Sequence, residues 1–286
     1  MSTPEKTDGP DFLCIGARKT GTTWLYAFLR NHPGCYMPKI KEMNFFNSVL
    51  FNAEPGKAPE KALAAKWAEI RPKKKLPADA PVPPEWSKNP LRWYLRTYRR
   101  DAGIVSGDVS PLYQDIPAER IKAIHAAVPK ARILYILRHP LERVLSDFSM
   151  LTNNRKIDIS TLSDDECMKL LQEHYSTSIR YTDIHRRWSA HFPVSVLWYD
   201  DLRSDPVAFA GQVCTLLGIA PMPELARETS NPNPSKSYGP RPTLSAGVKQ
   251  RLAEMLLPEA EDTDKVFANA WTAAWLKDIR AAAGKA

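Results

Sequence analysis

Apolar residues gather in four short runs along the chain, and each run lies close to turn or polar residues. Runs of this length that are rich in β-branched and aliphatic side chains are typical of strands buried on both faces. The sequence therefore predicts strands at residues 12–17, 104–109, 132–137 and 194–199.

Between and after these runs, apolar residues recur every three or four positions, which is the spacing of one face of an amphipathic helix. Strands that alternate with helices predict an α/β fold, here a P-loop-like three-layer arrangement in which a central parallel sheet is flanked by helices. Ligands on such sheets bind beyond the carboxyl ends of the strands, so the segments after the four predicted strands are expected to form the functional edge. The predicted helices are residues 22–31, 118–128, 141–151, 179–192 and 207–217.

The 286 residues are expected to form a single domain, residues 1–286, in which residues 1–11 are a flexible N-terminus. Residues 54–90 contain many prolines and one helical stretch at 60–69, around a basic cluster at 73–75. This composition indicates an excursion over the surface rather than a separate domain. The C-terminal third is predicted to be helical, with apolar residues spaced by four at Leu244, Val248, Leu252 and Leu256 and again at Phe267, Trp271 and Trp275.

The net charge of +8, from 40 Lys and Arg against 32 Asp and Glu, suggests an anionic partner. Nucleic acid, an acidic membrane surface and a nucleotide cofactor all satisfy this condition. A hydrophobic fraction of 43% and a charged fraction of 25% exclude a disordered or fibrous chain. No apolar run approaches the ~20 residues of a bilayer span, and the N-terminus is polar, so we expect a cytoplasmic protein without integral membrane association.

The most informative stretch is residues 12–26, FLCIGARKTGTTWLY, where a predicted strand leads into a tight loop and then a helix. Backbone N–H groups of such a loop, together with the positive end of the helix, form a cradle for an anion. Gly16 and Gly21 have the spacing of a Walker A loop, G-x-x-x-x-G. The lysine is displaced, however, because Lys19 precedes the second glycine and Thr22 occupies the position of the Walker lysine.

A metal ion is not expected at this loop. A kinase or ATPase needs a carboxylate at a strand end to organise Mg²⁺, whereas the third predicted strand ends in Arg138-His139-Pro140 and the next carboxylate is Glu142. The sequence therefore predicts that lysine, arginine and backbone donors bind the phosphate. No zinc site or disulfide scaffold is expected from the widely spaced Cys14, Cys35, Cys167 and Cys214.

Residues 18–25, RKTGTTWL, resemble the 5′-phosphosulfate loop of sulfotransferases that use 3′-phosphoadenylyl sulfate (PAPS). Three further segments are similar to motifs of that family, in the same order. Residues 41–46, KEMNFF, resemble the Lys-Glu-x-x-Phe-Phe segment of the carbohydrate-type branch. Residues 137–148, LRHPLERVLSDF, resemble the 3′-phosphate segment, and residues 236–241, KSYGPR, stand where the family has a late basic loop that closes over the nucleotide.

The resemblance implies a sulfotransferase of the EC 2.8.2 type that transfers the sulfuryl group of PAPS to a hydroxyl of a carbohydrate or other small-molecule acceptor. The product of the donor is 3′-phosphoadenosine 5′-phosphate (PAP). In this interpretation Glu42 is the general base and Lys19 stabilises charge on the bridging oxygen of the phosphosulfate. The resemblance also implies three groups of nucleotide-binding residues: Arg18, Lys19, Thr20, Gly21, Thr22, Thr23 and Trp24 in the first loop, Arg138 and Ser146 at the 3′-phosphate, and Lys236, Tyr238, Gly239 and Arg241 in the closing loop. The closing loop and the C-terminal helices together are expected to make up residues 236–286.

Several positions depart from the family pattern. His139 stands where the family has Asn or Asp, and Asn44, Asn47 and Val109 differ from the residues of the heparan sulfate glucosaminyl 3-O-sulfotransferase branch. Because these last three are acceptor-side positions, the resemblance leaves the acceptor open. Residues 54–90 and 153–176 lack a clear core pattern and are expected to frame the acceptor pocket.

Two other classes remain as alternatives. A Mg²⁺-dependent small-molecule or nucleotide kinase with a modified phosphate loop would explain residues 12–26, although the missing strand-end carboxylate speaks against it. A nucleic-acid-binding module would explain the net charge, but the sequence contains no recognised binding motif, so no nucleic-acid partner is expected.

Overall fold

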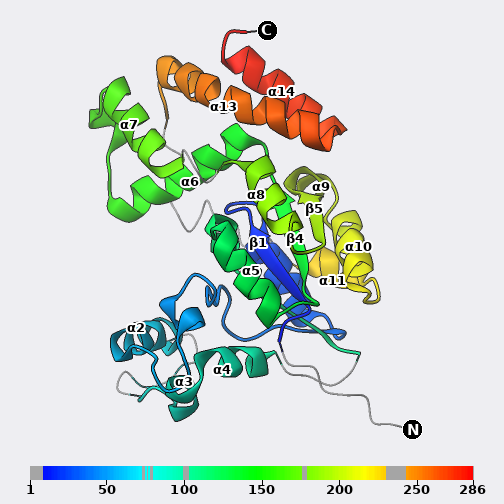
Figure 1. The fold of residues 1–286 in the computed structure, drawn as a ribbon. Helices are drawn as coiled ribbons and strands as arrows, with labels where there is room; N and C mark the ends of the chain where they lie inside the picture. The colour runs from blue at the N-terminus through cyan, green and yellow to red at the C-terminus, as the bar shows by residue number, and fades with distance from the viewer. Residues whose placement is uncertain are drawn as a thin grey trace.

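The computed structural model describes residues 9–285 except 73, 74, 76, 78, 79, 99–102, 176–178 and 230–242. Its centre is a five-stranded sheet in the order β2-β3-β1-β4-β5, and every pair of neighbouring strands is parallel (Figure 1). This arrangement confirms the predicted α/β class. The strands are β1 (Phe12–Gly16), β2 (Cys35–Tyr36), β3 (Val105–Val109), β4 (Arg132–Leu137) and β5 (Val194–Trp198).

The four strands predicted from the sequence agree with the structure to within one residue at each end. The edge strand β2 was not predicted, because two residues are too few to show a periodicity. At the centre of the sheet, Gly107 of β3 lies beside Phe12 of β1. A Cβ at Gly107 would lie 2.1 Å from the Phe12 ring, so this close approach of the two strands requires glycine.

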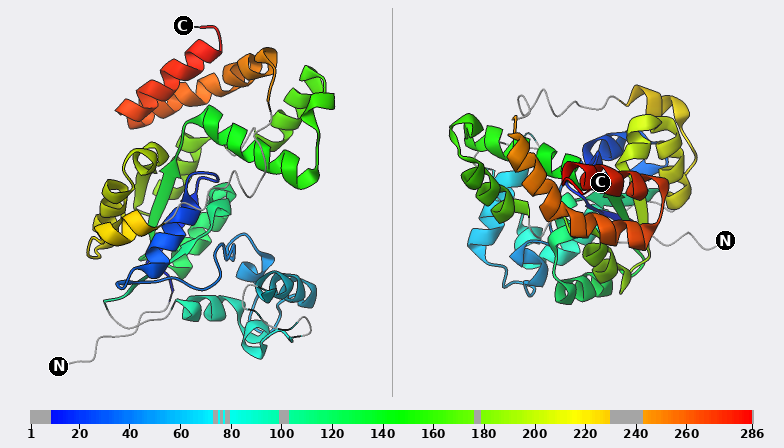
Figure 2. Two further views of the ribbon diagram at one scale, coloured as in Figure 1. Left: turned by 180° about the vertical axis from the view of Figure 1, so that it is seen from behind. Right: turned by 90° about the horizontal axis from the view of Figure 1, so that it is seen from above.

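Helices cover both faces of the sheet (Figure 2). Alternate residues of β1 point to opposite faces: Phe12 and Cys14 pack in one apolar cluster, whereas Leu13 and Ile15 pack in another. The first cluster includes residues of α1 (Thr22–Asn31), α9 (Tyr199–Ser204), α10 (Pro206–Leu217) and α11 (Pro223–Glu228). The second includes residues of η3 (Pro111–Asp115), α5 (Ala118–Ala127) and α8 (Tyr181–Ser189).

Residues 54–90 do have a core pattern, contrary to the expectation from the sequence. Their buried residues Leu63, Trp67 and Trp86 belong to the same apolar cluster as Leu13 of the sheet. The prolines and lysines of this stretch concealed the spacing of these apolar side chains. The segment forms α2 (Glu60–Ile70) and α3 (Pro84–Lys88), of which only α2 was predicted, and it is flanked by η1 (Val49–Asn52) and α4 (Pro90–Thr97).

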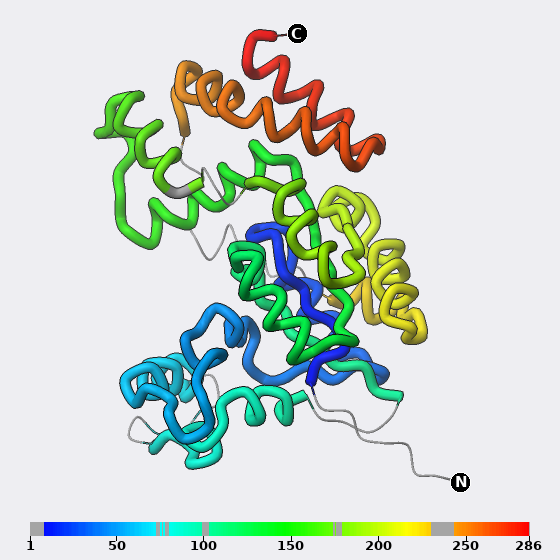
Figure 3. Tube along the Cα trace, viewed as in Figure 1, coloured from blue at the N-terminus to red at the C-terminus, as the bar shows by residue number. Residues whose placement is uncertain are grey.

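Residues after β4 form a further group of helices at the opposite end of the molecule from α2–α4 (Figures 1 and 3). This group contains α6 (Pro140–Arg155), η4 (Ile159–Thr161), α7 (Asp164–Tyr175), α13 (Ala246–Phe267) and α14 (Ala270–Ala282). The predicted apolar stripe of α13 is confirmed, because Val248, Leu252 and Leu256 pack with residues of α6 and α7. Residues 153–176 therefore also contain core residues, among them Met168 and Leu171, which the sequence analysis did not predict.

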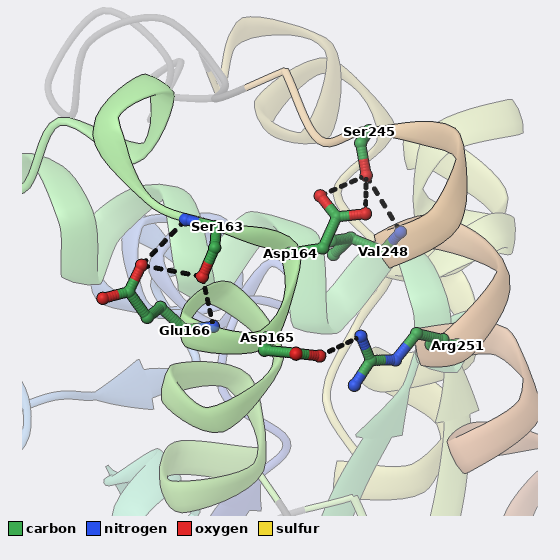
Figure 4. A network of polar contacts seen from close by, with 7 residues as sticks. All are labelled: Ser163, Asp164, Asp165, Glu166, Ser245, Val248 and Arg251. Atoms are coloured by element: carbon green, nitrogen blue, oxygen red, sulfur yellow. Dashed lines mark hydrogen bonds and ion pairs between the residues drawn. The ribbon is translucent and has the colours of Figure 1, made fainter.

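Polar contacts fix the start of α13 against the start of α7 (Figure 4). The hydroxyl of Ser245 donates to the carboxylate of Asp164 at 2.8 Å and also accepts the backbone N–H of Val248. One turn further along α13, Arg251 forms an ion pair with Asp165 at 2.7 Å. Both ion-pair partners are largely exposed, so these contacts set the position of the helix more than they stabilise the fold.

Candidate active site

The loops that follow β1 and β4 meet at the carboxyl edge of the sheet, because these two strands are neighbours. Nη1 of Arg138 donates a hydrogen bond to the backbone carbonyl oxygen of Lys19 at 2.9 Å. The structure thus brings the predicted phosphate loop into direct contact with the arginine predicted to bind the 3′-phosphate.

The phosphate loop has a tight geometry. Lys19 and Gly21 have φ values of 65° and 82°, in the left-handed region that disfavours a Cβ. A Cβ on Gly21 would also lie 2.4 Å from Cδ2 of Leu202, so this position requires glycine. The hydroxyl of Thr20 donates to the carbonyl oxygen of Ala17 at 2.6 Å and closes the turn. Helix α1 then begins without a side-chain cap, so the N–H groups of its first turn remain donors for an anion.

Positive charges gather around this loop. Burial lowers the pKa of Lys19, and the carboxylate of Asp147 raises it. Neighbouring cations lower the same pKa further, and they are Arg138, Arg18 and Lys41. Ammonium and guanidinium groups that repel one another in this way attract an anion, whose binding removes the repulsion.

Contacts within the site hold two of these cations in place. Arg18 forms an ion pair with Asp147 of α6 at 2.9 Å, and the Asp147 side chain is only 1% exposed. The guanidinium of Arg138 pairs with Glu142 at 3.2 Å and lies over the ring of Tyr199, 4.6 Å from its centroid. Asp147 was not predicted as a site residue, although an acidic residue directly after Ser146 in an amphipathic helix was a usable signal.

Glu42 lies in the segment between β2 and η1, beside the phosphate loop. Its carboxylate pairs with the ammonium of Lys41, which also acts electrostatically on Lys19. The Glu42 side chain is 39% exposed and so can be reached by an acceptor. Phe45 and Phe46 are buried in the core and anchor the segment that carries the carboxylate.

The other predicted site residues fall into three groups. Ser146 lies on α6, two turns after its start, and is partly buried. Thr22 is buried and Thr23 is exposed at the start of α1, while the Trp24 indole stacks on Phe28 in the core and donates to the carbonyl oxygen of Thr229 at 3.0 Å. Lys236, Tyr238, Gly239 and Arg241 lie outside the described residues.

A cavity of about 300 Å³ lies on the far side of Arg138, toward α14. Three carboxylates line it, from Glu142, Asp200 and Asp278, together with Arg138 and Arg203. Because the cavity is lined by negative as well as positive groups, it is less favourable for binding a polyanion than the cation-rich region around the phosphate loop is. In the described part of the chain, no group of three or more His, Cys, Asp or Glu could hold a metal ion.

Comparisons with known proteins agree with this geometry. A protein from Caenorhabditis briggsae named bifunctional heparan sulfate N-deacetylase/N-sulfotransferase 1 is 24% identical over 284 residues, which cover 91% of this chain and 29% of that protein. The mouse bifunctional heparan sulfate N-deacetylase/N-sulfotransferase 4 is 27% identical over 233 residues, which cover 74% of this chain and 22% of that protein. The chain thus spans less than a third of the length of these relatives.

Solved structures show the same fold. The crystal structure of a sulfotransferase from Alicyclobacillus acidocaldarius superposes with a TM-score of 0.62 at 21% identity and covers 93% of this chain and 98% of its own. The sulfotransferase domain of the Synechococcus PCC 7002 olefin synthase superposes with a TM-score of 0.53 at 18% identity and covers 94% of this chain and 98% of its own. Among the helices that the structure describes, none is both long enough and apolar enough to span a membrane.

A model of the sulfotransferase family matches residues 10–224. The matched region contains the phosphate loop, Glu42, Arg138 and Ser146. Because the match covers well over half of the chain, the protein belongs to the sulfotransferase family.

Proposed function

We propose that this enzyme transfers the sulfuryl group of PAPS to a hydroxyl of a carbohydrate, and that the nucleotide binds between the phosphate loop and the start of α6. The observation that carries the proposal is the cation cluster around the uncapped N-terminus of α1. Backbone N–H groups at a helix start and clustered cationic side chains are the donors that bind phosphate and sulfate groups.

Each phosphate group of the nucleotide has its own hydrogen-bond donors in this arrangement. The 5′-phosphate is assigned to Lys19, Arg18 and the backbone N–H groups of residues 20–24, and the indole of Trp24 stays in the core. The 3′-phosphate is assigned to the guanidinium of Arg138 and the hydroxyl of Ser146. Arg138 already contacts the Lys19 carbonyl, so the same side chain can connect the two phosphate sites.

Sulfuryl transfer depends mainly on positioning and charge stabilisation, as phosphoryl transfer does. PAPS supplies the sulfuryl group when it is bound. Glu42 accepts the proton of the acceptor hydroxyl, and the ammonium of Lys19 offsets the negative charge that grows on the oxygen of the leaving phosphate. In the absence of an acceptor the Glu42 carboxylate pairs with the ammonium of Lys41.

The named relatives support a carbohydrate as the acceptor class. Their names specify N-sulfotransferase activity, so the amine of a sugar is a second candidate acceptor besides a hydroxyl. Both acceptors lose a proton during sulfation, and Glu42 would serve as the base for either.

Calorimetric titration with PAP, with ATP plus Mg²⁺ and with a short oligonucleotide tests the donor assignment. We expect tight binding of PAP alone. Mg²⁺-dependent turnover of ATP would favour the kinase alternative, which gains no support from the family match. Preferential binding of the oligonucleotide would favour a nucleic-acid-binding module.

Release of PAP in the presence of defined oligosaccharides tests the acceptor. Comparing a glucosamine oligosaccharide with its fully N-acetylated form separates the two candidates, because acetylation blocks the amine and leaves the hydroxyls. Activity on both forms supports a hydroxyl acceptor, whereas activity on the free amine alone would overturn the hydroxyl assignment.

A further inference from the structure

Strand β3 contains a buried carboxylate that the proposed mechanism does not use. Asp108 of β3 is 2% exposed. Its Oδ1 accepts a hydrogen bond from the hydroxyl of Ser110 at 2.7 Å. Its Oδ2 accepts from the hydroxyls of Tyr113 at 2.7 Å and Tyr94 at 2.8 Å. Burial raises the pKa of Asp108, and the hydrogen bonds from Tyr113 and Ser110 counteract that rise.

Two of these hydroxyls also bind the segment that carries Glu42. The backbone N–H of Asn44 donates to the hydroxyl oxygen of Ser110 at 3.1 Å. The backbone N–H of Phe45 donates to the hydroxyl oxygen of Tyr113 at 3.0 Å. A hydroxyl that donates to a carboxylate becomes a better acceptor, so Asp108 strengthens both contacts.

The segment needs such support, because its backbone is in an unfavourable conformation. Glu42 and Asn44 have φ values of 58° and 47°, in the left-handed region that residues with a Cβ rarely adopt. The contacts at Asn44 and Phe45 lie two and three residues after Glu42 and fix the chain where it turns. The rings of Phe45 and Tyr94 stack with their centroids 4.4 Å apart and limit movement of the segment further.

The residues directly after β3 also contact β1, the strand that leads into the phosphate loop. The backbone N–H of Ser110 donates to the carbonyl oxygen of Cys14 in β1 at 3.0 Å. A Cβ on Gly16, at the end of β1, would lie 3.1 Å from the carbonyl oxygen of Pro111. The residues after β3 therefore contact both the Glu42 segment and the strand that carries the phosphate loop.

We propose that Asp108 is a positioning residue for Glu42, and that it acts through the hydroxyls of Ser110 and Tyr113 on the backbone of Asn44 and Phe45. This inference rests on the proposed function, because it assumes that Glu42 is the base. Asp108 itself is too deeply buried to touch the substrates, and it acts by keeping Glu42 at a fixed distance from the phosphate loop.

Two tyrosines provide a matched test. Tyr113→Phe removes a hydroxyl that binds both Asp108 and the Phe45 N–H, whereas Tyr94→Phe removes one that binds the same carboxylate oxygen and makes no hydrogen bond to the backbone of the segment. We expect Tyr113→Phe to lower kcat by roughly 10–100-fold, because small displacements of a catalytic group are costly, and Tyr94→Phe to lower it much less. PAP affinity, measured by calorimetry, should stay near the wild-type value in both variants.

A double-mutant cycle with Glu42→Gln separates positioning from stability. If Tyr113 acts through Glu42, adding Tyr113→Phe to Glu42→Gln lowers kcat no further. Additive losses, or equal losses in Tyr113→Phe and Tyr94→Phe, would overturn the positioning role of Asp108. Full turnover by Glu42→Gln alone would instead overturn the proposed base, and with it the reason to place Asp108 behind Glu42.

Discussion

The hydroxyl of Tyr181, at the start of α8, donates a hydrogen bond to the backbone carbonyl oxygen of Arg138, with 2.8 Å between the oxygens. Tyr181 is fully buried, so this contact fixes the main chain at Arg138, directly after the end of β4. The Arg138 guanidinium in turn binds the Lys19 carbonyl. Thus α8, the end of β4 and the phosphate loop form one connected unit.

Arg138→Ala should reduce the affinity for PAP more than the affinity for adenosine 5′-phosphate, which lacks the 3′-phosphate. Hydrogen bonds to charged groups contribute about 1.5–3 kcal/mol, so we expect PAP binding to weaken by roughly 10–100-fold. Both nucleotides should also lose a smaller amount, because the Lys19 carbonyl loses its donor. Calorimetric titrations with the two nucleotides measure the difference.

Arg132→Ala is the matched control for this experiment. Arg132 begins the same strand at its other end, where its guanidinium donates to the carbonyl oxygen of Leu216 at 2.7 Å. This variant should bind both nucleotides as the wild type does. Equal losses for PAP and adenosine 5′-phosphate in Arg138→Ala would argue against a role of Arg138 at the 3′-phosphate.

Lys19→Ala should impair both turnover and PAP binding, because the proposed mechanism assigns the same ammonium to the 5′-phosphate and to the oxygen on which charge develops. Removing one preorganised donor to such an oxygen costs about 10²–10³-fold in kcat. Steady-state rates and calorimetry measure the two effects separately. Lys130→Ala, at an exposed position before β4, is the control. Unchanged turnover in Lys19→Ala would overturn the assignment of the phosphate loop.

Glu42→Gln should reduce kcat by ~10²–10⁴-fold and leave PAP affinity near the wild-type value, because the amide cannot accept the proton of the acceptor. The amide keeps an oxygen that can accept a hydrogen bond from Lys41, so the segment should keep its position. Glu69→Gln, which removes the exposed carboxylate that pairs with Lys66 in α2, is a control for removal of a charge. Full activity of Glu42→Gln would place the base elsewhere.

Strands β1 and β4 were predictable because a parallel strand buried on both faces leaves a continuous apolar run in the sequence. The phosphate loop was predictable for a related reason, since its donors and glycines lie in one continuous stretch, residues 16–24. The positions of Glu42 and Arg138 beside that loop came from the resemblance to the sulfotransferase family. Nothing in the local pattern around Glu42 indicates how near it lies to Lys19.

The contacts that position these side chains were not predictable. Arg18 and Asp147 are 129 residues apart in the sequence, and their pairing depends on how α6 packs on the sheet. Asp108 left one local signal, an acidic residue inside an apolar strand, but its donors come from α4 and η3. Helices α3 and α4 depend on aromatic packing such as that of Trp86 against Trp93, which propensity and periodicity do not reveal.

A partly buried carboxyl of α13 binds the start of α8. Glu259 of α13 accepts the backbone N–H of Tyr181 at 2.7 Å. Burial raises the pKa of Glu259 from 4.5 to about 7, against the hydrogen bonds from the Tyr181 N–H and the Thr263 hydroxyl. Between these two values the folded protein binds a proton that the unfolded chain has released. The contribution of Glu259 to stability is therefore fully present below pH 4.5 and is lost as the pH rises through about 7.

We accordingly expect Glu259→Gln to reduce the decline in unfolding free energy between about pH 5 and pH 7, because each pKa unit corresponds to about 1.4 kcal/mol and the glutamine does not titrate. Urea denaturation at several pH values measures this slope, and Glu254→Gln, at an exposed position on the same helix, should leave it unchanged. Equal slopes in the wild type and Glu259→Gln would show that this carboxyl does not titrate in the window. Because the Tyr181 hydroxyl also binds the backbone carbonyl of Arg138, PAP affinity measured over the same pH range shows whether protonation of Glu259 affects the proposed nucleotide site.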